Sequence, residues 1–470
     1  MAGGVGEARD GGEACRSGAT CDERPLYQQV LAGERRLEFG LVGERLGHSH
    51  SPAIHAELGS VPYELVEVPR DRVRELFATR AFRGLNVTMP YKRDAAAACD
   101  ELSDAARRLG NANTLAVRAD GTLYGDNTDY HGFSRLVAAT GVDVAGRSCL
   151  VLGDGGAAAT VRAVLEDLGA SEVLTVSRRG TLTFDMLRAE AGDEVCDLRK
   201  RVSVIVNATP VGMYPHADDP LLVDLESFPS LACVCDLVYN PLSTRLVQRA
   251  RELGVPAEDG LGMLVAQAKR SSDVFLGVDR PDEVEDAVLA TIRARLTTVS
   301  LIGMPGCGKS SVGSELAALL GREFVDVDEL VVAAEGRSIE DIFAEGGEEA
   351  FREVETRCTA EATSRPGAVV ACGGGVVTRP RNLPFLRQNG PVVLLTRGLD
   401  APGTEAATGT GAEELSDEGR PMSRAKGVDR LREERAPLYH AWADVEVAAV
   451  GGARETAEAV AAALRVGGWL

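Results

Sequence analysis

A run of glycines that leads into a lysine and a serine carries the clearest chemical signal in the sequence. The stretch Gly303–Ser311 reads GMPGCGKSS, and it fits the pattern G-x-x-x-x-G-K-[ST] through Gly303, Gly308, Lys309 and Ser310. Glycines allow consecutive backbone N–H groups to close around a phosphate, while the lysine reaches the outer phosphates and the serine hydroxyl binds Mg²⁺. A glycine-rich turn beside a surface lysine is the alternative interpretation, and the flanking residues decide between the two.

The segments on either side of this loop favour phosphate binding. Val299–Ile302 is a short apolar run of the kind that forms a strand. After the loop, apolar residues from Val312 to Leu320 recur at helical spacing up to Gly321, which is typical of a residue just past a helix end. Strand, glycine loop and helix are the context that the motif requires, so we predict that the loop binds ATP with Mg²⁺.

The first 300 residues place polar side chains after several strand-like runs. Gly84–Lys92 ends in Thr-Met-Pro-Tyr-Lys, and the polar segments Gly110–Leu115 and Gly125–Asp129 flank a hairpin-like stretch that turns at Asp120-Gly121. A hairpin needs only its Asp-Gly turn, so the surplus of donors and acceptors indicates a polar ligand. The segment Gly47–Pro52, GHSHSP, could also bind a ligand, but its own residues favour a serine cap on a helix with proline in its first turn.

Residues 147–177 have the pattern of a strand, a glycine turn, a helix and a second strand. Arg147–Leu152 leads into Gly-Asp-Gly-Gly-Ala-Ala, and the second strand ends in Ser177-Arg178-Arg179. Arginines at this point suit the 2′-phosphate of NADP, whereas NAD-binding units usually carry an acid there. Asp154 puts a negative charge where a pyrophosphate would lie, and a βαβ unit without a dinucleotide is the alternative.

Composition and charge exclude several classes of protein. A chain of 470 residues, 44% of them hydrophobic, is long enough for about three domains. The formal net charge of −20 argues against nucleic acid as a partner. No apolar run is long enough to span a membrane, and the first residues lack the pattern of a signal peptide. The ten scattered cysteines fit reduced thiols in a cytoplasmic protein, and Cys233 and Cys235 fit the core of a strand.

From about Leu37 to Leu296 the sequence resembles the shikimate dehydrogenase family. The segments that carry the resemblance follow one another in the family's order: HSHSP, NVTMPYK, NANT, GDNTD, NATP and DGLGMLVAQA. The resemblance implies a substrate domain, a Rossmann domain that binds NADP(H), and the reduction of 3-dehydroshikimate. It implies a substrate site made of Ser49, Ser51, Thr88, Lys92, Asn113, Asp129, Tyr239 and Gln267. It implies a cofactor site made of Gly153, Gly155, Gly156, Ala157, Ser177, Arg178, Gly260 and Met263.

Lys92 and Asp129 match the catalytic pair of that family. Hydride that arrives at a ketone carbon leaves an alkoxide, which must gain a proton. A positioned ammonium group can bind this oxygen and give up a proton, and an adjacent carboxylate keeps the ammonium oriented.

From about Thr298 to Leu470 the sequence resembles the shikimate kinase family. In the strand-like Phe324–Asp328, Asp328 matches the residue that holds the reacting hydroxyl of shikimate. Ser338, with Asp341 three residues later, predicts the start of the next helix. The resemblance implies a substrate site made of Asp328, Arg352, Gly373, Gly374, Gly375 and Arg435. It implies an ATP site made of Gly303, Gly306, Gly308, Lys309, Ser310, Ser311 and Arg420, and a metal site at Ser310 and Asp326. Lys309, Asp328 and Arg420 are then the catalytic residues of phosphoryl transfer.

The segment between Arg397 and Arg420 departs from the kinase family. The family has a shorter, basic lid helix here, whereas this segment contains no lysine or arginine and is rich in Gly, Asp and Glu. An acidic lid repels the phosphates of ATP, so we expect a high KM for ATP or a lid that orders only with substrate.

We therefore predict an α/β protein with a disordered tail at 1–36, a substrate domain at 37–140 completed by 260–296, an NADP-binding Rossmann domain at 141–259, and a P-loop domain like the nucleoside monophosphate kinases at 298–470. The predicted function is a bifunctional cytoplasmic enzyme that makes shikimate with NADPH and phosphorylates it with ATP, with small molecules as substrates and no nucleic-acid or membrane partner. The alternatives are a dehydrogenase fused to a kinase-like ligand sensor, and a quinate-oxidising enzyme, which Ser49 and Ser51 disfavour. Oligomeric state and domain orientation stay open at this point.

Overall fold

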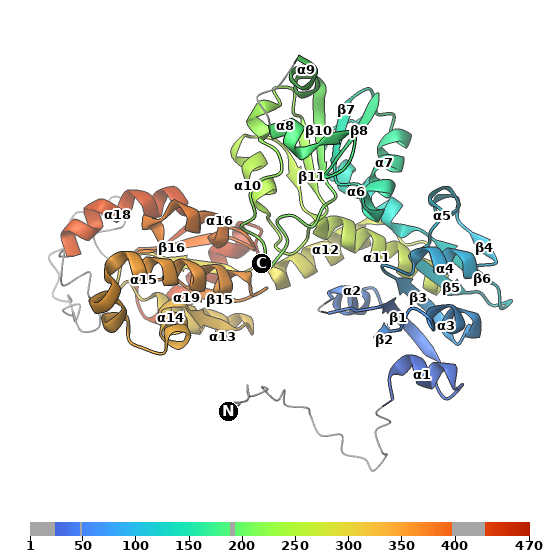
Figure 1. Ribbon diagram of the computed structural model, residues 1–470. Helices are drawn as coiled ribbons and strands as arrows, with labels where there is room; N and C mark the ends of the chain where they lie inside the picture. The colour runs from blue at the N-terminus through green and yellow to red at the C-terminus, as the bar shows by residue number, and fades with distance from the viewer. Residues whose placement is uncertain (1–23, 48, 189–192, 397–427) are drawn as a thin grey trace, which may run out of the picture.

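The computed structural model describes residues 24–47, 49–188, 193–396 and 428–470. It contains three sheets, each with helices packed around it, and we call these units the first, second and third body. Figure 1 shows the first body in blue and cyan, the second in green, and the third in orange and red. The predicted α/β class is confirmed, and most strands are parallel. Within the described ranges, no helix is both long and apolar enough to cross a membrane.

The first sheet has the strand order β2-β1-β3-β5-β6-β4. The β5–β6 pair is antiparallel and turns at Asp120-Gly121, as predicted, and Gly121 has a φ of 84°, a value that favours glycine. The strands are β1 (Leu37–Gly43), β2 (Tyr63–Glu67), β3 (Phe82–Val87), β4 (Glu101–Leu102), β5 (Thr114–Val117) and β6 (Leu123–Asp126). The helices are α1 (Leu26–Leu31), α2 (Ser51–Glu57), α3 (Val73–Thr79), α4 (Lys92–Ala98) and α5 (Asp104–Leu109).

The second sheet is parallel, in the order β12-β11-β10-β7-β8-β9. Every residue of β7, β10 and β11 is buried, because helices cover both faces of the sheet. The chain reverses its direction of strand addition between β7 and β10, and sheets of this type usually bind ligands at such a point. The strands are β7 (Ser148–Leu152), β8 (Glu172–Ser177), β9 (Leu182–Thr183), β10 (Val202–Asn207), β11 (Cys233–Asp236) and β12 (Ala257–Glu258). The helices are α6 (Thr128–Ala139), α7 (Gly156–Asp167), α8 (Phe184–Arg188), α9 (Asp193–Arg201), the short η1 (Leu225–Ser227) and α10 (Arg245–Glu252).

The third sheet is also parallel, in the order β14-β15-β13-β16-β17. Its central strand β13 leads through the phosphate loop into α13, which ends at Gly321 with a φ of 64°, as predicted. Ser338 caps α15 by accepting the backbone N–H of Asp341 at 3.1 Å, also as predicted, and the helix is interrupted at Gly347. The strands are β13 (Val299–Ile302), β14 (Phe324–Asp326), β15 (Val369–Ala371), β16 (Val392–Thr396) and β17 (Val445–Ala448). The helices are α13 (Lys309–Leu320), α14 (Val327–Glu335), α15 (Ile339–Ser364), η2 (Val376–Thr378), η3 (Pro380–Asn382), α16 (Leu383–Leu386), α18 (Val428–Trp442) and α19 (Ala453–Val466).

Two consecutive helices, α11 (Gly260–Leu276) and α12 (Asp282–Leu296), connect the three bodies (Figure 1). Near the start of α11, Met263 belongs to a core cluster of the second sheet. Near its end, Phe275 stacks on Phe39 of β1 with the ring centroids 5.5 Å apart. α12 then leads directly into β13, so one continuous segment contributes to every body.

The predicted disordered tail extends too far along the chain. Residues 1–23 lie outside the described residues, but Leu26–Leu31 form helix α1 inside the stretch assigned to the tail. Val30 is buried in the core of the first body, and Leu26, Tyr27 and Leu31 pack against that core. Their combined apolar surface is enough to hold a short helix, which the polar composition of the preceding residues concealed.

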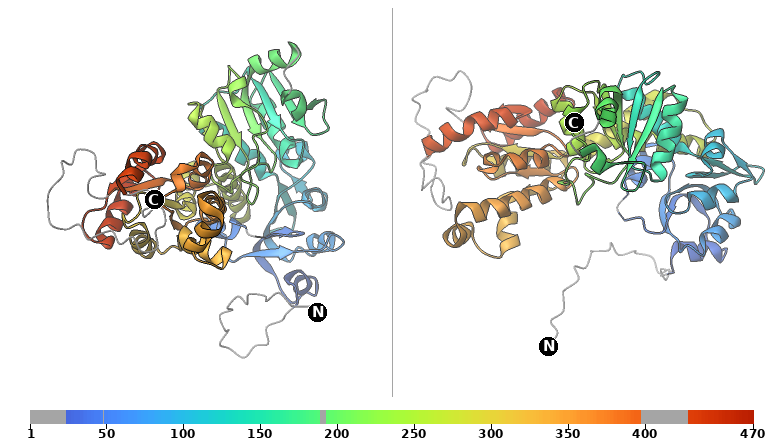
Figure 2. Two further views of the ribbon diagram at one scale, coloured as in Figure 1. Left: turned by 60° about the vertical axis from the view of Figure 1, so that its left-hand side comes forward. Right: turned by 45° about the horizontal axis from the view of Figure 1, so that its top comes forward.

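The third body contacts the second through Gln388 and Asn389. Figure 2 shows these bodies in two further views. The backbone N–H of Ser243 donates to the carbonyl of Gln388 at 2.8 Å, and that of Leu242 donates to Oδ1 of Asn389 at 3.0 Å. Nδ2 of Asn389 donates in turn to the carbonyl of Thr363 at 2.9 Å. The buried Asn389 side chain therefore joins the two bodies with both of its polar atoms.

We expect Asn389→Ala to loosen this contact. The change leaves the Leu242 N–H and the Thr363 carbonyl buried without a partner, which costs about 1–3 kcal/mol for each group. A calorimetric scan should show a lower unfolding temperature or a transition that splits in two. Thr291→Ala removes a hydroxyl that bonds only within α12 and should leave the scan unchanged. An unchanged scan of Asn389→Ala would show that this contact contributes little.

Candidate active sites

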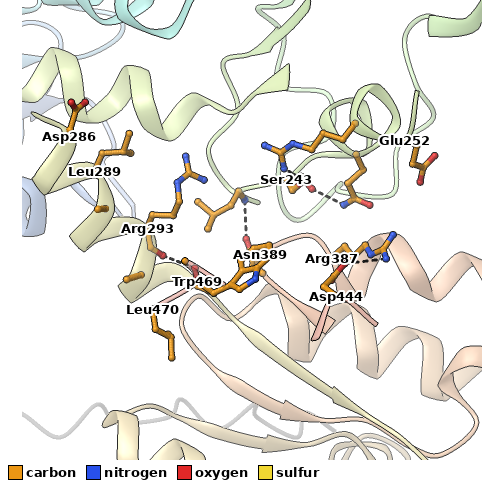
Figure 3. Close-up of a pocket in the computed structure, with 18 residues that line it drawn as sticks. Ser243, Glu252, Asp286, Leu289, Arg293, Arg387, Asn389, Asp444, Trp469 and Leu470 are labelled. Carbon is orange, nitrogen blue, oxygen red and sulfur yellow. Dashed lines mark hydrogen bonds and ion pairs between the residues drawn. The ribbon is translucent and has the colours of Figure 1, made fainter. Parts of the chain in front are cut away.

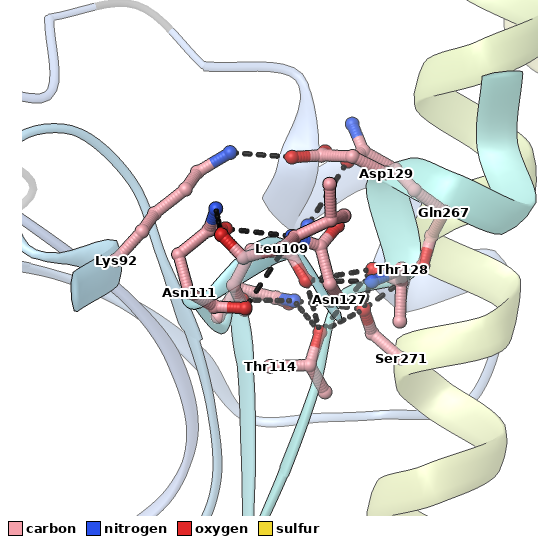
Figure 4. A network of polar contacts seen from close by, with 11 residues as sticks. Lys92, Leu109, Asn111, Thr114, Asn127, Thr128, Asp129, Gln267 and Ser271 are labelled. Carbon is pink, nitrogen blue, oxygen red and sulfur yellow. Dashed lines mark hydrogen bonds and ion pairs between the residues drawn. The ribbon is translucent and has the colours of Figure 1, made fainter. Parts of the chain in front are cut away.

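Lys92 and Asp129 form an ion pair at the centre of the first site. Lys92 begins α4 after the loop that follows β3, and Asp129 lies in the first turn of α6. Nζ of Lys92 lies 2.5 Å from Oδ2 of Asp129, and the side chains are 24% and 13% exposed (Figure 4). The pair is partly open to solvent, so the ammonium group can reach a bound molecule while the carboxylate holds it.

A network of hydroxyls and amides lies beside this ion pair (Figure 4). Oδ1 of Asn113 accepts the backbone N–H of Thr128 at 2.8 Å, and Nδ2 of Asn113 lies 3.5 Å from Oε1 of Gln267. Oγ of Ser271, one turn further along α11 than Gln267, lies 2.8 Å from the hydroxyl of Thr114 and 3.0 Å from that of Thr128. The network orients Asn113 and Gln267, two of the predicted substrate contacts.

Sequence reasoning missed Asn86 and Ser271 in this network. Nδ2 of Asn86 donates to Oγ of Ser271 at 2.8 Å, and the hydroxyl of Tyr63 donates to Oδ1 of Asn86 at 2.8 Å. A signal for Ser271 was present, because it follows Gln267 by four residues and therefore shares its helix face.

The serine segment before α2 contacts the start of that helix. The helix starts with Pro52 in its first turn, as predicted, and His50 occupies the N-cap position without a capping bond from its own side chain. Oγ of Ser49 accepts the backbone N–H of Ser51, the first residue of the helix, at 3.2 Å. The ring of Tyr239 packs edge-on against His50 with the centroids 5.9 Å apart, so a residue after β11 reaches this turn. The ligand interpretation of Ser49 and Ser51 stays a prediction, and the serine side chain of Ser49 bonds to the start of the helix.

The glycine loop after β7 leaves the start of α7 open. Gly155 is the N-cap and offers no side chain to the first N–H groups of the helix. Gly155, Gly156 and Ala157 are exposed, which suits an anion at the helix N-terminus. A Cβ on Gly156 would lie 3.7 Å from Sδ of Met89, an exposed residue of the loop after β3. The first and second bodies therefore face each other at this loop.

Other predicted cofactor residues lie around the same crevice. Ser177 is buried at the end of β8, and Arg178 beside it is exposed. Met263 is buried in α11. A Cβ on Gly260 would lie 2.2 Å from the carbonyl oxygen of Leu237, so packing alone is enough to require glycine at this position. The contact of Gly260 with the cofactor stays a prediction.

A buried carboxylate, Asp236, organises the strand ends next to this crevice. It accepts Nδ2 of Asn207 at 2.9 Å, the backbone N–H of Val238 at 3.0 Å and the hydroxyl of Thr244 at 2.6 Å. Burial raises the pKa of Asp236 to about 7, although these hydrogen bonds act to lower it. Asp236 joins β10, β11 and the start of α10, and so fixes the loop that presents Tyr239.

The second site begins at the phosphate loop of the third body. Gly303, Gly306 and Gly308 have φ values of 146°, 83° and 99°, which favour glycine. The buried Nζ of Lys309 donates to the carbonyls of Gly303 at 2.9 Å and Met304 at 3.1 Å, so the ammonium group lies inside the loop.

Ser310 and Asp326, the predicted metal residues, lie side by side. Oγ of Ser310 donates to Oδ2 of Asp326 at 2.6 Å. A hydroxyl and a carboxylate beside a phosphate loop are oxygen ligands that suit Mg²⁺. Ser311, the last predicted residue of the loop, is exposed in the first turn of α13.

The glycines 373–375 follow β15, and the second of them is held by three groups. Nη1 of Arg435 donates to the carbonyl of Gly374 at 2.9 Å, and the hydroxyl of Tyr439 donates to the same oxygen. A Cβ on Gly374 would lie 2.7 Å from Cγ of Pro305 in the phosphate loop. This contact brings the glycine turn against the predicted ATP site.

The neighbouring glycines make room for charged side chains. A Cβ on Gly373 would lie 2.4 Å from Oε1 of Glu355 and 3.0 Å from Oδ1 of Asp328. A Cβ on Gly375 would lie 2.0 Å from Nη1 of Arg352. Only glycine allows this backbone approach, so the turn, Asp328 and Arg352 lie together as predicted.

Glu355 completes the second site, and sequence reasoning missed it. Oε2 of Glu355 accepts Nη1 of the buried Arg352 at 2.5 Å. Its spacing of three residues from Arg352 on one helix was the available signal. Arg420 and the acidic segment at 398–419, which the sequence also predicts to matter, lie outside the described residues.

Asp328 has a raised pKa. Burial, followed by the negative charges of Glu355 and Asp326, raises its pKa to about 6, while Lys309 and Arg352 oppose the shift. Asp328 also keeps solvent-exposed surface, so the surrounding atoms crowd the carboxyl group without sealing it from solvent.

Comparison with known proteins identifies a family for each part of the chain. Residues 41–115 match the shikimate dehydrogenase substrate binding domain, and residues 305–465 match shikimate kinase. The shikimate dehydrogenase (NADP(+)) of Clostridium perfringens strain SM101 is 33% identical over 270 residues, covering 55% of this chain and 98% of that protein. The chain belongs to the shikimate dehydrogenase family. It also carries a shikimate kinase domain, and is therefore a fusion.

Two further relatives match the dehydrogenase part of this fusion. The shikimate dehydrogenase (NADP(+)) of Methylobacterium radiotolerans is 38% identical over 275 residues, covering 54% of this chain and 96% of that protein. A crystal structure of shikimate 5-dehydrogenase from Thermus thermophilus in complex with NADP(H) and shikimate is 31% identical, with a TM-score of 0.46. It covers 54% of this chain and 99% of that one. The shikimate kinase match lies entirely in the third body, which we call the kinase domain.

The electrostatic cause of the Asp328 shift can be tested by titration. We expect its carboxyl carbon to titrate with a midpoint near pH 6, and at lower pH in Glu355→Gln, because the like charge that raises the pKa is removed. Carbon-13 NMR of the carboxyl groups measures the midpoint in the unaltered chain and in Glu355→Gln. The signal of Asp328 is assigned by its loss in Asp328→Asn. Glu353→Gln, an exposed acid on the same helix, should not move the midpoint. Equal midpoints in all variants would contradict the assigned cause.

Proposed function

We propose that this chain reduces 3-dehydroshikimate to shikimate with NADPH and then transfers the γ-phosphoryl group of ATP to the 3-hydroxyl of shikimate. The observation that carries the proposal is the pairing of two sites in one chain. One site holds the solvent-open pair of Lys92 and Asp129, and the other holds Asp328 and two buried arginines beside a phosphate loop. The names of the dehydrogenase relatives and the shikimate kinase match support it.

In the reduction, Lys92 supplies the proton and Asp129 positions it. NADPH, when bound, supplies the hydride to the ketone carbon. The carbonyl oxygen then takes a proton from the ammonium group of Lys92, and the resulting alcohol is neutral. Asn113 and Gln267, held by the network beside them, bind hydroxyls of the substrate. The contact of the substrate with Ser49, Ser51, Thr88 and Tyr239 remains part of this proposal.

The open N-terminus of α7 and the arginines at the end of β8 are the proposed NADP site. Unsatisfied N–H groups at a helix start attract the pyrophosphate. Arg178 and Arg179 are exposed next to Ser177, and their positive charge suits the additional phosphate of NADP. Asp154 is exposed, so its side chain has room to lie away from the pyrophosphate.

In the kinase domain, the chain's own residues neutralise and orient the reacting groups. Ser310 and Asp326 would hold Mg²⁺, which neutralises phosphate charge. Lys309 lies inside the loop that surrounds the phosphates. Asp328 holds the shikimate hydroxyl and accepts its proton.

Two buried arginines are the proposed carboxylate site of the kinase domain. Arg352 and Arg435 approach the same glycine turn from α15 and α18. Glu355 fixes the guanidinium of Arg352. Paired guanidinium groups favour a planar carboxylate, the group that distinguishes shikimate from a simple polyol.

A kinase domain that binds ligands without turnover is the second candidate. The feature that favours it is the acidic segment before Arg420, which would weaken ATP binding. A coupled assay that measures shikimate 3-phosphate separates it from the proposed function.

We expect Lys92→Ala to slow the reduction of 3-dehydroshikimate at saturating substrate by about 10²–10⁴-fold, with a much smaller change in KM, because the proton donor is lost. Oxidation of NADPH, followed by absorbance, measures both the maximal rate and KM. The kinase rate of the same chain is an internal control, and Arg93→Ala, an exposed neighbour, should leave both rates unchanged. A near-normal maximal rate would remove Lys92 from the mechanism.

With 3-dehydroshikimate, NADPH, ATP and Mg²⁺ together, we expect the chain to form shikimate 3-phosphate and ADP. Asp328→Asn should abolish nearly all ADP formation and let shikimate accumulate at an unchanged rate, because only the second site is altered. Mass spectrometry of the products distinguishes the two acids. If the unaltered chain stops at shikimate, the binding-only kinase domain is the better assignment.

A further inference from the structure

A cavity of about 690 Å³ lies at the boundary between the dehydrogenase part and the kinase domain (Figure 3). The dehydrogenase part lines it with α10 and α12. The kinase domain lines it with Asn389 and Gly390, with Asp444 and with the segment Gly468–Leu470. Its volume is that of a small-molecule site, and such sites occur preferentially at domain interfaces. Neither proposed active site contains a residue of this lining.

The acidic side chains of the lining are already paired. Their negative charges are compensated by arginines, so they do not make the cavity negative. The ion pairs are Glu252 with Arg249 at 2.8 Å, Asp286 with Arg135 at 3.6 Å, and Asp444 with Arg387 at 3.2 Å.

Two arginines of the lining keep donors that lack a matching acceptor. Arg251 donates to Oγ of Ser243 at 3.4 Å and to the carbonyl of Ala257 at 3.3 Å, both long and neutral contacts. The carboxylate of Glu258 lies within electrostatic range of Arg251. Among the described residues, the buried Nε of Arg387 has no hydrogen-bond partner. These donors suit an anionic group, which would make charge-assisted hydrogen bonds.

The remaining lining is largely apolar. Leu242 and Leu289 come from the dehydrogenase part, and Trp469 and Leu470 come from the kinase domain (Figure 3). An indole ring and leucine side chains favour a flat apolar body over a sugar or a phosphate ester. The cavity therefore combines an apolar wall with Arg251, whose hydrogen bonds go to the neutral oxygens of Ser243 and Ala257.

We propose that this cavity binds a small organic anion whose apolar body lies against Trp469 and Leu289 and whose carboxylate lies at Arg251. Because both parts of the chain line the cavity, the bound anion contacts both and stabilises their present arrangement. The proposal stands apart from the two reactions proposed above and is tested by binding alone.

The probe is 2-naphthoate, added to the full chain, with the neutral 2-naphthamide as its matched control. Trp442 and Trp469 are the two tryptophans of the sequence, and both emit. Trp442 is buried and Trp469 lines the cavity, so the quenching that Trp469→Phe removes is assigned to Trp469. We expect saturable quenching and calorimetric binding of 2-naphthoate, with 2-naphthamide at least about tenfold weaker. Trp469→Phe should abolish the quenching.

Three variants locate the site. Arg251→Gln should weaken the binding of 2-naphthoate by about tenfold and leave the affinity for 2-naphthamide unchanged. Ala290→Trp, in the lining on α12, should fill the cavity and prevent binding of both. Arg245→Gln, on the same helix as Arg251 but outside the lining, should change nothing.

Three results would overturn the proposal: equal affinity for the acid and the amide, binding that persists in Ala290→Trp, or no saturable binding at millimolar probe. The comparison of acid with amide uses the unaltered chain, so it decides the ligand class even if a variant fails to fold. Unfolding temperatures of the variants show whether each one is folded.

Discussion

Charged groups that lie inside a pocket must be balanced by other charges, and both proposed sites depend on this requirement. Lys92 is held by Asp129, and Arg352 is held by Glu355. Removing an ion from water costs several kcal/mol unless a partner compensates it. Each site therefore contains its own counter-charge, which keeps the charged group oriented. Asp328 is the exception, because burial and then the like charges of Glu355 and Asp326 raise its pKa.

This balance in the kinase domain is possible only because the backbone approaches the charges closely. Gly373 and Gly375 lie where any side chain would overlap Glu355 or Arg352. The carbonyl of Gly374 accepts a hydrogen bond from Arg435, and Gly374 packs against Pro305 of the phosphate loop. A single turn after β15 thus brings the proposed carboxylate site next to the proposed ATP site. At this turn, glycine is required because a larger residue would overlap the charged side chains packed against it, and backbone flexibility is the lesser reason.

The helices α11 and α12 make the two parts of the fusion structurally dependent on each other. α11 places Gln267 and Ser271 at the dehydrogenase site and reaches the cores of both the first and second bodies. α12 continues into the central strand of the kinase domain and lines the cavity at the boundary. The guanidinium group of Arg322 in the kinase domain donates to the carbonyls of Ala294 and Thr297 at the end of α12. A disturbance at the boundary therefore reaches a helix that is continuous with both parts of the fusion.

The sequence by itself determined the elements that adjoin each motif. The strand, loop and helix around Gly303–Ser311 and the hairpin at 120–121 are local patterns, because their periodicity and turn residues act over a few positions. It also named most of the site residues through their resemblance to two families. Only the tertiary structure decided that Ser271 joins the dehydrogenase network, that Glu355 lies between Arg352 and Asp328, and that α1 packs on the first body. These contacts join segments whose neighbours in space are set by packing of the whole chain, and no local periodicity encodes which distant side chains meet.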